Sequence, residues 1–332
     1  MDSLPLHPPG FEDSIRRAIA SPPDGVDPWF TEYFGDVRDA RGLASYMRAK
    51  QQLLQLAGGV RGKDVLDAGS GFGAVSHLMA AWGARRVYAL EIYGPMARSH
   101  ALLHEAHFPD HRQVYLLRGN VQAIPLKPDS VDLVLSIEAI SHYYDVDAFL
   151  DECARVLRPG GVLLISDGNN GANPGLRRFT EGLWQRFELG PRGAWHGHDI
   201  QDTMVERRER LLRERFPRLE EAKVHALARA TSGWDAARIE RAVAEHLAGG
   251  PAPNAPYRRG TCPRDPNWGY WLERLFDPRG LACELANRGF EARAIPHYGG
   301  ARNDVVLAVN RVLQALPSFR YARGFRIVAR KR

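Results

Sequence analysis

Several features common in membrane and secreted proteins are missing from this sequence. No apolar run approaches the roughly 20 residues that cross a bilayer. The first ten residues lack a basic stretch followed by an apolar one, so we expect no signal peptide. The three cysteines, Cys153, Cys262 and Cys283, are odd in number and have no CxxC spacing. Together these absences favour a reduced, cytoplasmic setting.

The positive charge of the chain is concentrated near its C-terminus. The formal net charge is +6, but residues 302–332 hold eight Lys or Arg and one acidic residue, which leaves the remainder at −1. An enzyme acting on nucleic acid more often carries basic residues around its active-site mouth, so we expect no nucleic-acid partner. The basic segment is interpreted as a solvated edge strand and tail, with contact to an anionic partner as the alternative.

A short stretch, Val65–Gly73, predicts a ligand site. Its apolar start is typical of a buried strand, Gly69 and Gly71 can adopt positive φ, and helical spacing begins near Ala74. A helix placed there directs unpaired N–H groups and partial positive charge at the turn. Such a turn suits a nucleotide-like ligand with an anionic end.

Two cofactor classes use such a turn. The spacing Gly69-x-Gly71-x-x-Ala74 satisfies the dinucleotide fingerprint, and Glu91 lies near the position of the acid that binds ribose hydroxyls. Asp67 shifts the balance, because a carboxylate two residues before the first glycine would repel a pyrophosphate. It would instead suit an ammonium or a sulfonium group, and S-adenosylmethionine (SAM) carries both.

The resemblance to class I SAM-dependent methyltransferases continues beyond this turn. Four further stretches resemble the family's motifs in the expected order, and together with the turn they cover residues 56–167. They are the second strand (Val87–Glu91), the adenine turn (Arg118–Val121), the fourth strand (Val131–Ser136) and the turn into the fifth strand (Leu157–Ile165).

This resemblance implies an α/β fold with a doubly wound, mostly parallel seven-stranded sheet, helices on both faces and a helical cap inserted after the fifth strand. We expect four segments: an N-terminal helical segment (1–58), the SAM-binding core (59–168), the inserted substrate cap (169–277) and the rest of the core sheet (278–332). A helix is expected over 304–316, before the last strand. The cap is expected to be helical over 176–188, 200–216 and 235–247, without strands.

The resemblance also implies a cofactor site at the carboxyl ends of the strands. Asp67 would hold the methionine amino group, Glu91 both ribose hydroxyls, and Asn120 the adenine amine, although Asn120 could instead only form the turn beside Gly119. The expected cofactor-binding residues are Asp67, Gly69, Ser70, Gly71, Gly73, Glu91, Ile92, Asn120, Val121 and Ile137. No metal is expected.

Candidate catalytic residues follow the fourth strand. Glu138 and His142 are candidates for a general base, needed if the acceptor must lose a proton, and Tyr143 could orient it. A structural hydrogen bond is the alternative role of His142. Asp145 is interpreted as the N-cap of the next helix rather than as a catalytic acid.

Aromatic and histidine-containing stretches elsewhere have two interpretations each. Trp29, Tyr33, Phe34 and Tyr46 could form a lid over the cofactor, or pack in the core. His196 and His198 could bind metal, but no further ligands of familiar spacing accompany them, so a polar loop is favoured. His297 and Tyr298 could reach the pocket. The stretch 257–271 could hold a phosphate or carboxylate with Arg258 and Arg259, or its tryptophans could pack in the core.

These features favour a methyltransferase acting on a small molecule by O-, N- or C-methylation, with no membrane span and an undetermined oligomeric state. Two alternatives remain: a nucleic-acid or protein methyltransferase, and a non-catalytic SAM-binding partner subunit. The first is disfavoured because Ser136–Ala139 stands where an Asn/Asp-Pro-Pro-aromatic motif would follow the fourth strand.

Overall fold

The computed structural model describes residues 8, 10–298, 305, 308–309, 312 and 318–332. The chain forms two compact units. The first consists of Met1–Ile140, Asp145–Ala172 and Phe276–Arg332, and the second of Ser141–Tyr144 and Asn173–Leu275. The finer division into four segments stays a prediction.

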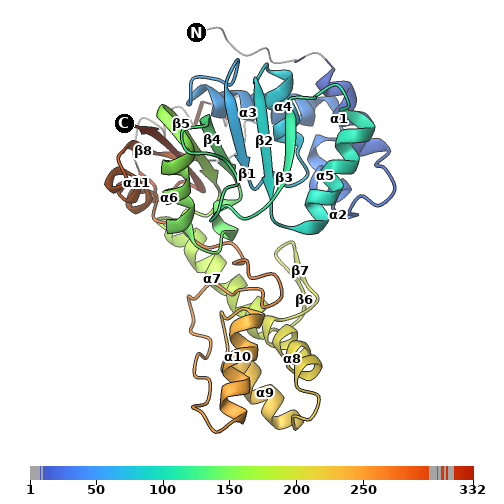
Figure 1. Cartoon of the computed structure of the whole chain (residues 1–332), viewed down its shortest axis with the longest axis vertical. Coiled ribbons are helices and arrows are strands. Elements are labelled where there is room, and N and C mark those ends of the chain that lie inside the picture. Colours follow the sequence, from blue (N-terminus) through green and yellow to red (C-terminus); the bar gives the residue numbers. More distant parts are fainter. Residues whose placement is uncertain (1–7, 9, 299–304, 306–307, 310–311, 313–317) are drawn as a thin grey trace. The chain divides into compact units, whose positions relative to one another are not determined.

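The first unit contains a seven-stranded sheet with the order β3-β2-β1-β4-β5-β9-β8 (Figure 1). Its strands are β1 (Asp64–Ala68), β2 (Arg86–Glu91), β3 (Val114–Arg118), β4 (Val131–Ile137), β5 (Leu157–Asp167), β8 (Phe290–His297) and β9 (Gly324–Lys331). Strands β1 to β5 are parallel, whereas β9 runs antiparallel between β5 and β8. The predicted mostly parallel seven-stranded sheet is confirmed.

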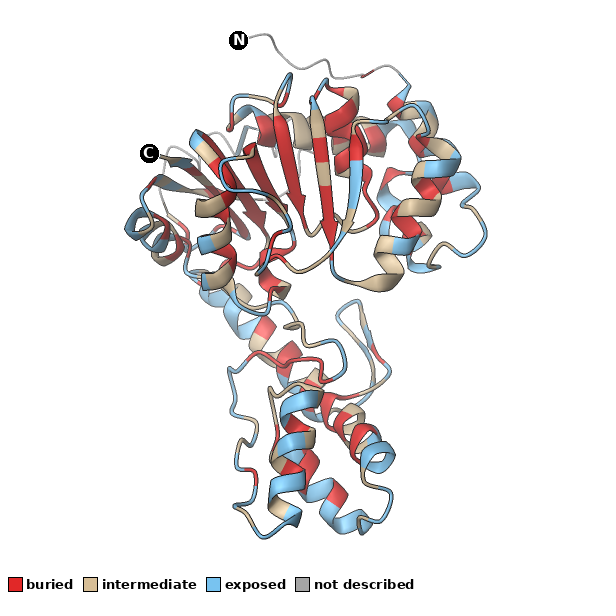
Figure 2. Ribbon diagram, viewed as in Figure 1, coloured by how far each residue is buried: buried red, intermediate tan, exposed pale blue. Residues whose placement is uncertain are grey.

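The central strands are apolar because both faces of the sheet are covered (Figure 2). All five residues of β1 are buried, as are the last seven of β5. One core cluster joins alternate residues of the strands, such as Val65 and Leu135, to residues of α1, α3, α4 and α5. Helix α6 packs against β5, and α11 packs against β8 and β9, with their buried residues outside that cluster. Helices therefore cover both faces, as predicted.

The helices of the first unit are α1 (Phe11–Ala20), α2 (Trp29–Tyr33), α3 (Ala40–Gln55), α4 (Ala74–Ala81), α5 (Gly94–His107), α6 (Val146–Val156) and α11 (Pro278–Asn287), with a 3-10 turn η1 (Gly35–Val37). Two of them begin where the sequence predicts, α4 at Ala74 and α6 after Asp145. Asp145 is the N-cap of α6, because its side chain accepts a hydrogen bond from Ala148 N. The helix expected over 304–316 lies largely outside the described residues.

The interpretation of the basic C-terminal segment as an edge strand is wrong. Strand β9 is internal, because β5 and β8 flank it on either side. Several of its cations have partners in the sheet: Arg330 donates to Gly160 O, and Lys331 pairs with Asp129. Arg326 is buried, with 8% of its surface exposed.

The second unit is mostly helical, as predicted, but it also holds elements that the sequence did not suggest. It contains α7 (Pro174–Leu189), η2 (Ile140–His142, shared with the first unit), β6 (Gly193–Trp195), β7 (His198–Ile200), α8 (Met204–Arg215), α9 (Glu221–Arg229) and α10 (Ala236–Leu247). Apolar residues of α8, α9 and α10 form its core, among them Leu212, Val224 and Ile239. Helix α9 was missed.

The expectation of a polar loop around His196 and His198, in a cap without strands, is wrong, because β6 and β7 form a hairpin there. Trp195 pairs with His198, and the two residues between them, His196 and Gly197, have φ of 46° and 86°. Two successive positive φ values are the signature of a type I′ turn, which matches the twist of a hairpin. In the described residues no group of three His, Cys, Asp or Glu side chains could hold a metal ion.

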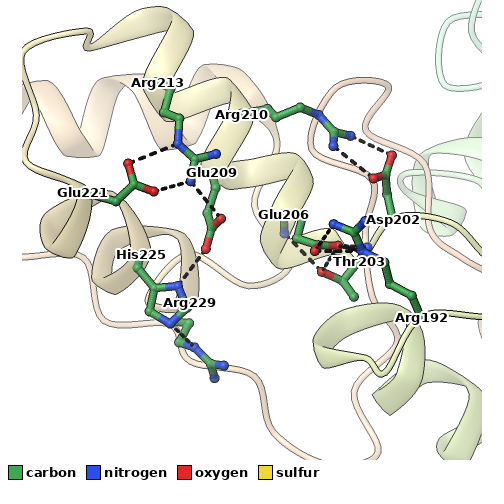
Figure 3. Close-up of polar contacts among 10 residues, drawn as sticks. All are labelled: Arg192, Asp202, Thr203, Glu206, Glu209, Arg210, Arg213, Glu221, His225 and Arg229. Atoms are coloured by element: carbon green, nitrogen blue, oxygen red, sulfur yellow. Dashed lines mark hydrogen bonds and ion pairs between the residues drawn. The ribbon is translucent and has the colours of Figure 1, made fainter.

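Charged side chains link the loop before α8 to α8 and α9 on the surface of the second unit (Figure 3). Thr203 and Glu206 form a capping box at the start of α8. The ion pairs of this surface are Arg192–Glu206, Arg210–Asp202, Arg213–Glu209, Arg213–Glu221 and His225–Glu209. Exposed pairs of this kind contribute little individually, so the apolar core remains the main stabilising feature of the unit.

The stretch 257–271 fits neither interpretation fully. Arg258 and Arg259 are exposed, as solvated arginines would be, but Trp268 is 55% exposed, so its expected core packing is wrong. The aromatic contacts belong instead to Arg264, whose guanidinium lies 3.8 Å from the centre of the Tyr144 ring and pairs with Asp235.

Among the described helices, none has the length and apolar character that crossing a membrane would require.

Candidate cofactor and acceptor site

The glycine turn after β1 is fastened to the end of β2. Gly69 N and Ser70 N both donate to Leu90 O, at 2.9 and 3.0 Å, and Gly71 N donates to Glu91 Oε2 at 2.8 Å. Gly69, Gly71 and Gly73 have φ of 75°, 56° and 82°, so the left-handed conformations that the sequence suggested are present. The turn leads directly into α4, whose first N–H groups lack helical partners.

Gly73 is also required by the packing beneath it. A Cβ at this position would lie 1.9 Å from Nε2 of the buried His100 ring. That ring is itself held by His77, since the two Nε2 atoms are 3.3 Å apart. By contrast, a Cβ at Gly71 would meet only Met96 Sδ, at 3.8 Å. Packing against His100 therefore requires a glycine at position 73, whereas at position 71 only the left-handed backbone favours one.

Asp67 lies at the carboxyl end of β1, with 3% of its surface exposed. Burial raises the pKa of its carboxyl to about 6, although a hydrogen bond from Ser76 and the charge of Lys50 act in the opposite direction. Ser76 Oγ donates to Asp67 Oδ2 at 2.6 Å and fixes the carboxylate from α4. A buried carboxylate of this kind is well suited to a cationic ligand.

Glu91 has a structural role beside its predicted role. Its two carboxylate oxygens accept hydrogen bonds from Gly71 N and Tyr93 N, each at 2.8 Å. Each oxygen has a second lone pair, so binding of ribose hydroxyls stays compatible with these bonds. Ile92, next in the chain, is 57% exposed.

Ser70 Oγ is buried and has no hydrogen-bond partner in the described part of the chain. A buried hydroxyl without a partner is unfavourable unless a ligand or water satisfies it. A cavity of about 250 Å³ lies here and reaches past β2 toward β3. Its lining includes Ser70 and Glu91 together with Arg98 and Arg118.

The Asn120 side chain bonds within the turn beside Gly119, the role that was the alternative to adenine binding. Its side-chain oxygen accepts from Gln122 N at 3.0 Å, and its amide nitrogen donates to Gln122 Oε1 at 2.7 Å. One lone pair of the oxygen remains, so a bond from the adenine amine stays a prediction. Val121 is buried and Ile137 is half-buried.

Aromatic residues of α2 cover Phe72 of the glycine turn. The rings of Trp29 and Tyr33 lie 5.9 and 5.8 Å from the Phe72 ring, and both residues are about half exposed. Phe34 is buried and packs in the core. Phe34 thus fits the core interpretation, whereas a lid role for Trp29 and Tyr33 stays a prediction.

Glu138 follows β4 in a left-handed conformation, with φ of 49°. Its backbone N donates to Ser166 O, and its Oε2 accepts from Gly168 N at 3.0 Å. Desolvation raises the pKa of Tyr33, and the negative charges of Glu138 and Asp67 raise it further. The end of β4 therefore faces the same space as the end of β1.

His142 and Tyr143 belong to the second unit, whereas Glu138 belongs to the first. His142 Nδ1 lies 2.9 Å from Trp271 O, which makes Nδ1 the protonated nitrogen of the neutral ring and leaves the lone pair on Nε2. Tyr143 is buried, and its carbonyl oxygen accepts from Arg274. A joint catalytic role for these three residues stays a prediction.

Sequence reasoning missed two cations of the first unit, Lys50 and Arg326. Lys50 lies on the apolar face of α3, with Nζ 5.2 Å from the centre of the Tyr46 ring. Desolvation lowers its pKa, opposed by the negative charges of Glu138 and Asp67. Burial and the positive charges of Arg326 and Lys50 lower the pKa of His297 to about 3. The sequence did offer a signal for these two cations: a charged residue within the apolar face of a helix, as for Lys50, or within a buried strand, as for Arg326.

Comparison with known proteins gives the family. Residues 66–165 match a family described as a methyltransferase domain. The chain is 34% identical over 191 residues to a probable SAM-dependent methyltransferase of Mycolicibacterium smegmatis. These 191 residues cover 55% of this chain and 71% of that protein. It is 36% identical over 129 residues to a probable SAM-dependent methyltransferase of Mycobacterium tuberculosis, covering 38% of this chain and 44% of that protein.

A third relative, named ubiquinone biosynthesis O-methyltransferase, is from Sodalis glossinidius. It is 31% identical over 151 residues, which cover 45% of this chain and 57% of that protein. The chain belongs to the SAM-dependent methyltransferases and is an enzyme whose cofactor is SAM. The residues of the turn fit that cofactor, because Asp67 offers a buried negative charge, Ser70 an unpartnered hydroxyl and α4 a positive N-terminus.

We expect Gly73→Ala to destabilise the protein more than Gly71→Ala. The added methyl group at position 73 must displace His100 and also occupies a left-handed conformation, for a combined loss of about 3 kcal/mol in the free energy of unfolding. At position 71 only the conformation is unfavourable, for about 1 kcal/mol. Denaturant unfolding of both variants measures the difference, and equal losses would show that His100 does not constrain the turn.

We expect the affinity for SAM to fall in acid because of Asp67. Its carboxyl has a pKa of about 6 in the free protein, and only the ionised form attracts the ammonium and sulfonium groups. Affinity should therefore be full above pH 7 and about tenfold weaker at pH 5. Calorimetry across this range is the measurement. Asp67→Asn should bind more weakly at pH 7.5 and lose this pH dependence, and an unchanged profile in that variant would assign the titration to another group.

Proposed function

We propose that this enzyme methylates a small-molecule acceptor, on oxygen, nitrogen or carbon. The observation that carries the proposal is the set of polar side chains at the carboxyl ends of β1 and β4 in the first unit, where the charge of Lys50 interacts with those of Glu138 and Asp67. Such a mixture of a few polar groups with aromatic rings is typical of sites for small organic molecules. The name of the Sodalis relative points to the same class of acceptor.

SAM, when bound, supplies a methyl group that is already activated for transfer. The chain's residues then mainly have to position the acceptor in line with that group, because good orientation alone gives a large acceleration. Asp67 and Glu91 would hold the cofactor on the β1 and β2 side. Glu138, Ile137 and the residues after β4 would face the acceptor.

A general base is required where the acceptor loses a proton, and the chain offers two. Glu138 carries a carboxylate beside Lys50 at the end of β4. His142 has its Nδ1 engaged with Trp271 O, so that its Nε2 is the basic atom, and the neighbouring Tyr143 would orient the acceptor. The inserted segment of residues 169–277 would serve as the substrate cap.

The setting that we propose is cytoplasmic, which agrees with three free thiols at Cys153, Cys262 and Cys283. We propose no nucleic-acid partner. Part of the C-terminal positive charge is engaged within the sheet, as Arg330 and Lys331 show.

The acceptor class can be measured directly with labelled cofactor. Purified enzyme is incubated with SAM carrying a labelled methyl group and with a cell extract separated into metabolites and macromolecules. We expect label in the metabolite fraction. Label confined to protein or nucleic acid would contradict the proposal, and label in neither fraction, with SAM binding intact, would indicate a non-catalytic subunit.

The base can be identified with Glu138→Gln and His142→Gln, using the acceptor that this labelling reveals. Removing a general base should lower kcat by about 100-fold while leaving SAM affinity unchanged, since neither residue is expected to hold the cofactor. The variant that retains its activity serves as the control for the other. If both retain kcat within about threefold, the acceptor needs no base and positioning accounts for the reaction.

A further inference from the structure

In the described residues, Arg326 is a largely buried cation without a carboxylate partner. Arg326 is 8% exposed, its Nε is buried, and in the described residues no acceptor contacts that atom and no carboxylate pairs with the side chain. The pKa of Arg326 is lowered by burial alone. Other buried arginines of this protein have partners: Arg208 pairs with Glu188, and Arg264 pairs with Asp235.

A largely buried cation without a counterion is unfavourable, because its remaining contact with solvent replaces only part of its hydration. Arginine cannot relieve this by losing its proton at ordinary pH. A protein that keeps such a group therefore gains something from it, and a ligand that supplies the missing negative charge is the direct explanation.

The register of the sheet shows which face Arg326 occupies. Arg326 pairs with Ser166 of β5, which pairs with Ile137 of β4. Leu135 lies two residues before Ile137 and pairs with Asp67 of β1. Side chains two residues apart point to the same face, so Arg326 and Asp67 share one face at the carboxyl edge of the parallel strands.

A second buried nitrogen atom without a partner lies next to Arg326 on that face. His297 belongs to β8, two residues beyond Ile295, the register partner of Arg326. Its Nδ1 is buried and, like Arg326 Nε, has no partner in the described residues. Lys50 of α3 adds a further positive charge close to both. Two unpartnered nitrogen atoms thus lie on the same face of the sheet, and the charge of Lys50 acts on both residues.

Arg326 and His297 lie on the acceptor side of the enzyme. Between β1 and β9 the sheet order places β4 and β5, so three strand spacings, about 14 Å, separate the backbone of Asp67 from the strand of Arg326. The residues expected to hold the cofactor lie at β1, β2 and β3. Glu138, at the end of β4, lies between the two groups.

We propose that Arg326, with His297, forms a subsite that binds a carboxylate of the acceptor molecule, and this rests on the proposed function. A carboxylate matches the two parallel N–H groups of a guanidinium. A single negative charge also suits the subsite better than a dianion, because Glu138 and Asp67 are near enough to influence Lys50. The acceptor is therefore a carboxylic acid, methylated at another atom or at that carboxylate.

The test uses the full-length enzyme saturated with S-adenosylhomocysteine, with benzoate and octanoate as probes and benzamide and octanamide as their uncharged matches. Calorimetry or ligand-observed NMR measures binding. We expect at least one carboxylate to bind tenfold or more tightly than its amide. Arg326→Gln should abolish that preference. Arg330→Gln, on the same strand but exposed and bonded to Gly160 O, should keep it.

Three outcomes would overturn the proposal. If neither carboxylate is preferred over its amide by the wild type, the subsite does not exist as described. If inorganic phosphate binds more tightly than both carboxylates and depends on Arg326, the ligand is a phosphate instead. If Arg326→Gln weakens S-adenosylhomocysteine tenfold or more, the guanidinium holds the cofactor's own carboxylate.

The stability of the variant separates a ligand role from a structural one. Removing an unpaired buried cation should leave Tm unchanged or raise it, whereas a lower Tm would show that Arg326 supports the fold and would overturn the proposal. Failure of the proposed function can be distinguished from failure of the carboxylate subsite. In the first case label from SAM enters macromolecules or no fraction, and in the second the separate binding measurement shows no preference for a carboxylate.

Discussion

The hydrogen bonds between the glycine turn and the end of β2 are the constraint on which the site depends. Gly69 and Ser70 donate to Leu90 O, and Gly71 donates to the Glu91 carboxylate. The same carboxylate is the group predicted to receive the ribose hydroxyls, so one residue both shapes the turn and is expected to face the ligand. Phe72, between these glycines, extends the constraint to α2 through its ring contacts. A shift of the turn would therefore disturb both the cofactor site and the N-terminal helices.

Charge divides the carboxyl edge of the sheet into two regions. Asp67 and Glu91 place negative charge at β1 and β2, where a cationic sulfur compound is expected. Arg326 places positive charge at β9, and Lys50 lies close enough to interact with Glu138, Asp67 and Arg326. A buried charge is unfavourable unless a neighbouring group or a ligand of opposite charge compensates it. The separation of sign along the sheet is consistent with a cationic cofactor at one end and an anionic acceptor at the other.

The parts of this fold that were predictable from the sequence are those fixed by local patterns. The turn of Gly69–Gly73, the start of α6 at Asp145 and the parallel strands each depend on a few adjacent residues. The hairpin at His196–Gly197 was missed although it also carried a local signal, since a glycine follows a residue that tolerates positive φ. Arg326 could not be interpreted locally. The environment of Arg326 depends on the pairing of β9 with β5 and β8, whose residues lie about 160 and 30 positions away in the sequence. The same pairing makes β9 an internal strand and explains why the expectation of an edge strand was wrong.

The backbone of Glu138 gives an independent reason to connect the end of β4 with function. A residue other than glycine in the left-handed region is unfavourable by roughly 1 kcal/mol, and such residues tend to persist where geometry serves a purpose. Here φ of 49° allows the Glu138 N–H to reach Ser166 O while the carboxylate returns to Gly168 N. A glycine would adopt this backbone more easily, but it would remove the carboxylate that accepts from Gly168 N and interacts with Lys50. The left-handed backbone at this position therefore supports the proposed role of the Glu138 side chain.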